Sequence, residues 1–174
     1  AEEAPDSLAE RVNNRSRRPS SDAFREFMGS QWGPRPDPGI TRSAVADYLP
    51  ARAIAAGEPF AGERLVIPAG TYKVRSNDCT YRFRAYSAFA HLSGLGQERE
   101  PDSVIVLEPL PEGGHEAVLY FKPRTSRSSQ EFYSDSRYGE FWVGARPSLE
   151  EVSAETGLRC EHIDTLRDAL AKDA

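Results

Sequence analysis

The sequence of 174 residues has few cysteines and histidines, and it lacks every common metal-ligand motif. Its two cysteines, Cys79 and Cys160, do not have the spacing of a zinc site and are too few for a disulfide framework. We therefore expect two free thiols. The three histidines, His91, His115 and His162, are isolated, and none belongs to H-E-x-x-H or to a Cys/His ligand pair. The residues of this chain thus predict no metal site.

The sequence also lacks long apolar runs and an excess of positive charge. No stretch approaches the ~18 to 20 apolar residues of a membrane-spanning helix. The start, AEEAPDSLAERVNN, is acidic and polar, unlike a signal peptide. We therefore expect a cytoplasmic protein with no membrane partner. The net charge of −5 disfavours a nucleic-acid partner, because phosphate binding needs a basic face. The basic stretch RSRRPSS, residues 15–21, is expected to be solvated.

No local catalytic motif is present. The G-x-S-x-G turn of serine hydrolases is missing, and SGLGQERE lacks the third glycine of a dinucleotide-binding loop. EREPD, residues 98–102, is typical of a turn and not of a spaced carboxylate pair. His115 follows two glycines and is expected to be exposed in a turn, whereas His91 lies in a strand-like pattern and is expected to be a hydrogen-bonded structural residue. A site assembled from distant residues would leave no such motif.

The first part of the chain resembles an arm rather than a domain. DSLAERV, residues 6–12, has the S-x-x-E spacing of a capping box and predicts a short helix start. Residues 20–29 place three apolar side chains on one helical face before a glycine ends the pattern. Residues 31–40, QWGPRPDPGI, contain three prolines and predict an extended connector. We expect an N-terminal arm over residues 1–42.

From residue 43 onward the pattern predicts a layered α/β domain. A helix is expected from Ser43 to Gly57, with a break or kink at Pro50. Strand patterns follow at residues 64–70, 81–95, 103–109 and 116–124, with a hairpin turn at PLPEGGH between the last two. Ser148 and Glu151 have capping-box spacing and predict a helix start, and residues 164–171 predict a last helix.

A tryptophan in GEFWVGARPS, residues 139–148, is the strongest candidate for a functional side chain. Trp142 is either a core residue on a short strand or a surface residue that meets a ligand or another subunit. Arginines and aromatics near predicted strand ends add to the candidates, because both are enriched at interfaces and around bound carboxylates. The alternative is that the aromatics fill the core and the arginines pair with Asp78 and Glu100. These candidates are Arg75, Arg82, Arg84, Arg146, Tyr81, Tyr86 and Phe89.

Several stretches in combination resemble the amino-terminal domain of the Xaa-Pro aminopeptidases, the aminopeptidase P family. They are RLVIPAGTYKVRSNDCTYRFRAYSAFAHLSGLGQEREPDSVIVLEP, AVLYFKPR and EFWVGAR. The family pattern R-x-x-D-x-x-Y-x-x-R-x-x-S-x-F, then Leu and Gly, then E-P-D, then W-x-G-x-R, is matched in order by Arg75, Asp78, Tyr81, Arg84, Ser87, Phe89, Leu92, Gly94, Glu100, Pro101, Asp102, Trp142, Gly144 and Arg146. Ala88, His91 and Ser93 depart from the usual acidic residue, tyrosine and threonine.

The resemblance implies a mixed β-sheet between helices, of the ribonuclease H-like type, over residues 43–174, and a domain that continues beyond them. It implies a parent enzyme that removes an amino-terminal residue preceding proline. It also implies that catalysis belongs to a following domain, where two manganese ions are held by two aspartates, a histidine and two glutamates. This chain would then be non-catalytic, with its own catalytic domain, further copies of itself and proline-containing peptides as partners.

The same resemblance assigns roles to single residues. Trp142 would form a wall of the substrate cleft of a neighbouring subunit, and Gly144 would let the backbone pass closely. Tyr81 and Phe89 would belong to the same cleft or interface region. Arg146 and Arg84 would also lie there, as structural ion-pair residues rather than substrate ligands.

Two other functions remain open at this stage. The chain is alternatively a stand-alone module of the same fold that binds proteins or peptides without catalysis. It is otherwise the amino-terminal domain of a prolidase or creatinase, although the W-x-G-x-R and E-P-D matches favour aminopeptidase P.

Overall fold

The computed structural model describes residues 21–77 and 79–172. The predicted helix start at residues 6–12, most of the basic stretch and the side chain of Asp78 lie outside the described residues. Backbone contacts divide the chain into two units. Unit 1 comprises Ala1–Pro34 with Thr125–Ala145, and unit 2 comprises Arg35–Arg124 with Arg146–Ala174. The boundary predicted after residue 42 stays a prediction.

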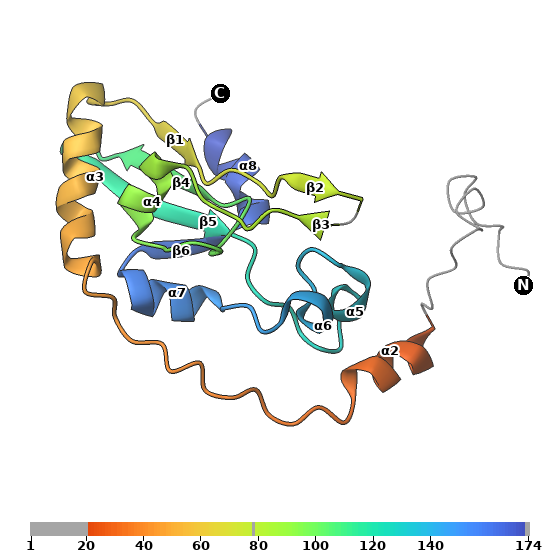
Figure 1. The fold of residues 1–174 in the computed structure, drawn as a ribbon. Helices are drawn as coiled ribbons and strands as arrows, with labels where there is room; N and C mark the ends of the chain where they lie inside the picture. Colours follow the sequence, from red (N-terminus) through yellow and green to blue (C-terminus); the bar gives the residue numbers. More distant parts are fainter. Residues whose placement is uncertain (1–20, 78, 173–174) are drawn as a thin grey trace, which may run out of the picture. The chain divides into compact units, whose positions relative to one another are not determined.

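A four-stranded mixed sheet forms the centre of unit 2 (Figure 1). β1 and β5 are antiparallel to β4, whereas β6 is parallel to β5. The sequence does not predict β6, because its residues RCEH are short, polar and partly exposed and show no apolar alternation. The strands lie in the order β1 (Leu65–Pro68), β4 (Val104–Pro109), β5 (His115–Phe121) and β6 (Arg159–His162).

Alternation along the central strands produces two hydrophobic clusters, one on each face of the sheet. On β4, Ile105 and Leu107 belong to the larger cluster and Val106 belongs to the smaller one. β5 alternates in the same way, because successive side chains of a strand point to opposite faces. The run SVIVLEP is therefore apolar on both faces, as predicted.

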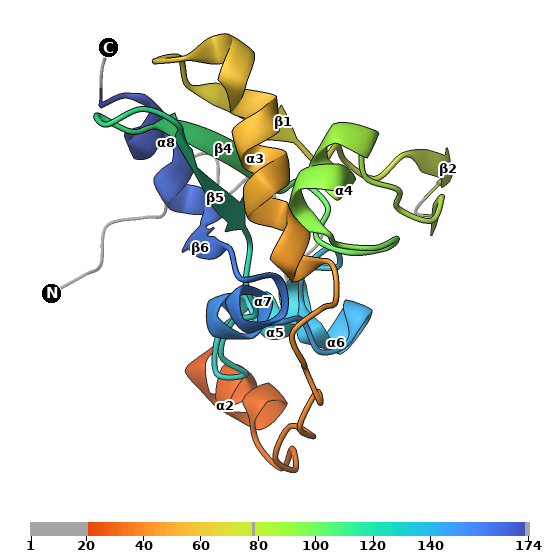
Figure 2. The same ribbon diagram turned by 90° about the vertical axis from the view of Figure 1, so that its left-hand side faces the viewer.

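Helices cover both faces of the sheet (Figure 2). The larger cluster includes residues of α3 (Leu49–Gly57), α4 (Ser87–Ser93) and α7 (Leu149–Thr156). The smaller cluster is closed by α8 (Leu166–Leu170) and the preceding 3-10 turn η3 (Ile163–Thr165). The predicted mixed sheet between helices is confirmed.

The strand predicted over residues 81–95 is wrong, because residues 81–86 form no strand and residues 87–93 form α4. Phe89 and Leu92 are three positions apart, so a helix turns both into the core, where they are buried. Gly94 then ends the helix with a φ of +68°. His91 lies on the exposed side of α4, so its expected role as a structural strand residue is also wrong.

Two further local predictions need correction. Pro50 does not kink a helix. It lies in the first turn of α3, where its missing N–H has no intrahelical partner to lose, and the 3-10 turn η1 (Ala46–Tyr48) precedes it. His115 is not exposed: it is the first residue of β5, is 9% exposed, and its Nε2 lies 2.8 Å from the carbonyl oxygen of Glu63.

Residues 74–80 form a small separate hairpin of β2 (Val74–Ser76) and β3 (Cys79–Thr80). Its strands are antiparallel, and all of their described residues are exposed. The base of the hairpin is fixed to unit 2 by Phe83, which is 3% exposed and contacts Tyr72 edge to face at 5.7 Å between ring centroids.

The described residues of unit 1 contain three short helices, α2 (Asp22–Gly29), α5 (Glu131–Ser134) and α6 (Glu140–Val143). α2 confirms the predicted helix, and Ser21 caps it by accepting a hydrogen bond from the backbone N–H of Phe24. The ring of Phe24 meets Tyr133 edge to face at 5.4 Å, whereas Phe27 is 66% exposed. The predicted apolar face of α2 is therefore only partly covered.

The chain crosses between the units three times, and the crossings after Arg124 and before Arg146 lie side by side within unit 2. The backbone N–H of Arg124 donates to the carbonyl oxygen of Pro147 at 3.1 Å. The guanidinium of Arg124 also donates to both carboxylate oxygens of Glu151 at 2.7 Å. Glu151 in turn completes the predicted capping box with Ser148 at the start of α7. Residues 125–145 thus leave and rejoin unit 2 at one place.

None of the helices in the described part of the chain is long and apolar enough to cross a membrane.

Candidate functional site

The tryptophan singled out in the sequence lies on α6, and its side chain is 59% exposed. Its indole Nε1–H donates to the carbonyl oxygen of Tyr133 at 2.7 Å, so the ring is held by its polar edge. The ring of Phe141 meets it edge to face at 5.9 Å between centroids. Trp142 is neither buried nor on a strand, which removes both premises of the core interpretation.

Two glycines set the ends of α6 for different reasons. A Cβ at Gly139 would meet the carbonyl oxygens of Glu131, Phe132 and Asp135 at 2.5 to 2.7 Å, so no side chain fits there. Gly144 ends the helix with a φ of +82°, a conformation that favours glycine. The flanking glycines noted in the sequence therefore fold the segment that presents Trp142.

An aromatic cluster supports α6 from within unit 1. Trp32 contacts Phe132 at 5.4 Å and Phe141 at 6.4 Å between ring centroids, edge to face in both cases. Phe132 is 1% exposed, whereas Trp32 and Phe141 are about half exposed, at 48% and 49%. Trp32, Phe141 and Trp142 therefore form a continuous row of partly exposed rings.

An ion pair lies beside this row. The guanidinium of Arg127 donates to Oε1 of Glu140 at 2.7 and 3.1 Å and to the carbonyl oxygen of Gly33 at 2.7 Å. It also lies over the ring of Trp32, 5.4 Å from the centroid. Arg127 thus joins the segment carrying Trp32 to the helix carrying Trp142.

The arginine of the W-x-G-x-R segment forms a buried ion pair in unit 2. Nη2 of Arg146 donates to Oε2 of Glu100 at 3.1 Å, and their side chains are 10% and 4% exposed. Arg99 extends the group through a two-fold hydrogen bond to Glu155 at 2.7 and 3.0 Å. This geometry is that of a structural pair.

Burial and charge act in opposite directions on Glu100. Burial raises the pKa of its carboxyl group, and the charges of Arg146 and Arg99 lower it, with a net rise above 4.5. The pKa of Arg99 is raised as well, chiefly by its hydrogen bond to Glu155. Burial raises the pKa of the Cys160 thiol to about 12. Cys79 and Cys160 are both free thiols, as predicted.

The other predicted site residues have different surroundings. Tyr81 is 59% exposed at the end of the β2–β3 hairpin, and Arg84 is exposed close by. No other described residue forms an ion pair with Arg84, so its predicted structural pairing is not seen. Phe89 is fully buried on α4, packed in the larger cluster, and cannot meet a ligand or another subunit there.

A surface pocket of about 380 Å³ opens in unit 2 between α3, the start of β5 and the turn after α7. Its floor is apolar, with Leu49, Ala53 and Leu158, and Arg42 and Arg159 lie at its rim. Both arginines are paired with carboxylates, to Asp47 and to Glu116 and Glu161. None of the predicted site residues lines it.

Sequence reasoning missed the partners of the candidate residues. The sequence predicts only an extended connector around Trp32 and gives no indication of a role for Arg127. Their positions far from residue 142 in the chain leave no spacing pattern. The one available signal is composition, because a tryptophan in a proline-rich connector needs partners outside that connector.

The sequence model of the family "Aminopeptidase P, N-terminal domain" matches residues 52–174. Xaa-Pro aminopeptidase 2 of Streptomyces coelicolor is 40% identical over 145 residues, covering 83% of this chain and 30% of that protein. Xaa-Pro aminopeptidase 1 of the same organism is 42% identical over 151 residues, covering 86% of this chain and again 30% of the relative. The chain thus spans about a third of the length of these relatives.

Solved structures agree with the fold. The His354Ala variant of Escherichia coli aminopeptidase P aligns with a TM-score of 0.58 at 22% identity, over 74% of this chain and 26% of that one. Proline aminopeptidase P II from Yersinia pestis aligns with a TM-score of 0.56 at 24% identity, over 72% of this chain and 26% of that one. At these identities the likeness shows the fold.

Proposed function

The chain belongs to the family of the aminopeptidase P N-terminal domain, and we propose that it is the non-catalytic N-terminal domain of a manganese-dependent Xaa-Pro aminopeptidase. The whole protein would act in the cytoplasm and release an N-terminal residue that precedes proline. The observation that carries this proposal is the identity of 40% to 42% with two Xaa-Pro aminopeptidases over more than four-fifths of the chain.

The described residues of this chain do not fit a two-metal centre. Among the described residues, no group of three or more histidine, cysteine, aspartate or glutamate side chains could hold a metal ion. In this proposal the manganese ions are therefore held by a following catalytic domain, and no catalytic step is assigned to this chain. Its own tasks would be oligomerisation and shaping of the substrate cleft.

Trp142 is the residue we propose for the cleft. A half-exposed indole fixed through its N–H presents an apolar face without losing much side-chain freedom on binding, and aromatic faces suit proline rings. We propose that it lines the cleft of a neighbouring subunit, with Tyr81 and Arg84 on the subunit interface. Arg146 contributes through its pair with Glu100, as a structural residue.

A chimaera tests the assignment. The 145 matched residues of Streptomyces coelicolor Xaa-Pro aminopeptidase 2 are replaced by the matching part of this chain. With manganese and an Xaa-Pro peptide, we expect the chimaera to release the first residue and this chain alone to release none. A folded chimaera without activity would contradict the proposal and favour the stand-alone binding module. Release by this chain alone would contradict its non-catalytic role.

Within that chimaera, Trp142→Ala should lower kcat/KM for short Xaa-Pro peptides by about tenfold. The reason is that tryptophan is among the residue types whose truncation costs the most binding energy at a contact surface. Val143→Ala is the matched control, since Val143 is 46% exposed on the same helix and carries no aromatic ring. Unchanged kinetics with an unchanged oligomeric state would remove Trp142 from the cleft. A large drop in melting temperature would show instead that the indole supports the fold.

A further inference from the structure

The β2–β3 hairpin is exposed along both of its strands. An isolated two-stranded hairpin is marginally stable in water, and here only the base of the hairpin is fixed to the core, through Phe83. Val74, Tyr81 and Tyr86 on and beside it are 69%, 59% and 56% exposed. Exposed aromatic and branched side chains on a projecting element are typical of an interface.

The hairpin together with the residues that flank it, residues 73–84, is basic in an acidic chain, and we call this segment the basic hairpin. Residues 73–84 contain four basic residues and one acidic residue, so they contribute +3 to a chain of net charge −5 and leave −8 on the rest. Arg82 is paired with Glu98 at 3.3 Å. Lys73, Arg75 and Arg84 are exposed, and in the described part of the chain no carboxylate forms an ion pair with them.

Exposed carboxylates gather at the opposite end of the sheet. Glu58 lies in the 3-10 turn η2 (Glu58–Phe60), Glu63 precedes β1, and Glu112 lies in the turn between β4 and β5. The bond between His115 and the backbone of Glu63 joins these turns. All three side chains are exposed, and none is ion-paired with another described residue. The neighbouring charges Arg64 and Glu108 neutralise each other at 2.7 Å.

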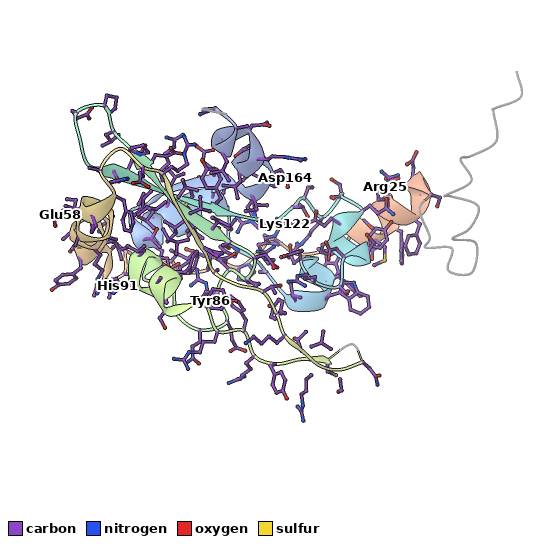
Figure 3. The ribbon with its side chains drawn as sticks, turned by 90° about the horizontal axis from the view of Figure 1, so that it is seen from above. Arg25, Glu58, Tyr86, His91, Lys122 and Asp164 are labelled. Carbon is purple, nitrogen blue, oxygen red and sulfur yellow. The ribbon has the colours of Figure 1, made fainter. Side chains whose placement is uncertain are left out.

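β1 connects the two ends. Leu65 at its start pairs with Leu107 near the end of β4, and Pro68 at its end pairs with Val104 at the start of β4. The acidic turns therefore lie where β1 begins, and the basic hairpin extends from where β1 ends. Figure 3 shows the labelled Glu58 at one end of the sheet and the hairpin extending from the other.

We propose that two copies of this chain associate antiparallel, with the basic hairpin of each copy on the Glu58, Glu63 and Glu112 end of the other. The two ends of unit 2 carry opposite charges, so an antiparallel pair forms the same attractive contact twice. Such a two-fold pair is closed, because both contact surfaces of each copy are then occupied and no further copy can add. This deepens the oligomerisation role proposed above by naming its surface. The association is measured without peptidase activity, so its failure leaves the enzyme assignment untouched.

Charge-reversed variants of the full chain test the pairing by sedimentation. The hairpin variant carries Arg75→Glu and Arg84→Glu, and the acidic-end variant carries Glu58→Lys and Glu112→Lys. Each alone brings like charges together and should remain monomeric in 50 mM salt. Their equimolar mixture restores opposite charges at both contacts and should form a one-to-one heterodimer. All four positions are exposed, so circular dichroism should show unchanged folding.

The unchanged chain should dimerise in 50 mM salt, with a dissociation constant that rises about tenfold or more in 500 mM salt, because salt screens exposed charges. A control with Arg42→Glu and Arg137→Glu changes the net charge equally at exposed arginines outside residues 73–84, and should dimerise like the unchanged chain. A chain that is monomeric at low salt would overturn the proposal. So would a dimer that the hairpin variant still forms, or a mixture of the two variants that stays monomeric.

Discussion

Glu100 carries a carboxyl group where water hardly reaches it. Its side chain is 4% exposed and lies 3.1 Å from the guanidinium of Arg146, whose side chain is 10% exposed. Its main chain adopts a φ of +47°, and its carbonyl oxygen accepts a hydrogen bond from Ser103 at 2.7 Å. Removing one partner of such a pair leaves the other charge buried without compensation, which is far more costly than losing a surface pair.

Glu100→Ala should therefore lower the free energy of unfolding by about 3 kcal/mol, measured by urea denaturation at pH 7. Glu100→Gln should cost clearly less, because its side-chain oxygen still accepts the hydrogen bond from Arg146. An equal loss in both variants would show that the pair does not hold the guanidinium.

The pH dependence of Glu100 has a defined sign. The pKa of the Glu100 carboxyl group is raised in the folded chain above its ordinary value of 4.5. The stabilising contribution of Glu100 is therefore complete below pH 4.5 and is lost as the pH rises through the pKa of the folded chain. The stability of the unchanged chain should thus fall relative to Glu100→Gln as the pH rises above 4.5. A difference that moves the other way would show that the arginines outweigh burial.

The two cysteines should differ in reactivity. Burial raises the pKa of the Cys160 thiol to about 12, so little thiolate forms at pH 8, whereas Cys79 is exposed. We expect a thiol reagent to modify one cysteine quickly at pH 8 and the second only after denaturation, followed by intact mass. Cys79→Ser should abolish the fast reaction. Two equally fast reactions would contradict the burial of Cys160.

At the scale of elements, α7 is held at its start by two reciprocal hydrogen bonds. Ser148 Oγ accepts from the N–H of Glu151 at 3.2 Å, and the Glu151 carboxylate accepts from the N–H of Ser148 at 3.0 Å. Burial by itself raises the pKa of Glu151, but the hydrogen bonds from Ser148 and Arg124 outweigh it, and the net pKa is lowered. The cap therefore favours the ionised carboxylate.

Ser148→Ala should lower the free energy of unfolding by about 1 kcal/mol, measured by thermal or urea denaturation. Ser76→Ala, at an exposed position of β2, is the matched control and should have little effect. Glu151→Gln should cost stability at pH 7, and this cost should shrink as the pH falls through the lowered pKa of Glu151. A loss of stability in Glu151→Gln that stays the same at low pH would show that packing, and not the ionised carboxylate, is responsible.

Elements with local signals were predicted and those made by distant contacts were not. The capping box of α7 and the glycine pair between β4 and β5 are readable within a few residues. β6 exists because its backbone pairs with β5, which no pattern in RCEH indicates. The sequence predicts a strand in place of α4 because Tyr81 and Phe83, just ahead of the helix, alternate with polar residues. Trp142 was found from its flanking glycines, but its neighbour Trp32 lies far away in the chain.

At the scale of the whole molecule, the two hydrophobic clusters of unit 2 contain no residue from 125–145. The sheet and its helices should therefore fold without that segment. Replacing residues 125–145 by a short Gly/Ser linker should leave a cooperative unfolding transition, with a free energy within about 2 kcal/mol of the unchanged chain. Circular dichroism and thermal melting measure this. Loss of the cooperative transition would show that the segment is needed for folding.

The hydrogen bond between Arg124 and Pro147 also has an evolutionary meaning. Unit 2 holds the two ends of residues 125–145 close together. The length and sequence of this segment can therefore change while its endpoints keep their positions. Selection on the surface of this segment then acts on one stretch of sequence, and selection on the folding of unit 2 acts on another. The surface of residues 125–145 can therefore change in evolution without destabilising the fold of unit 2.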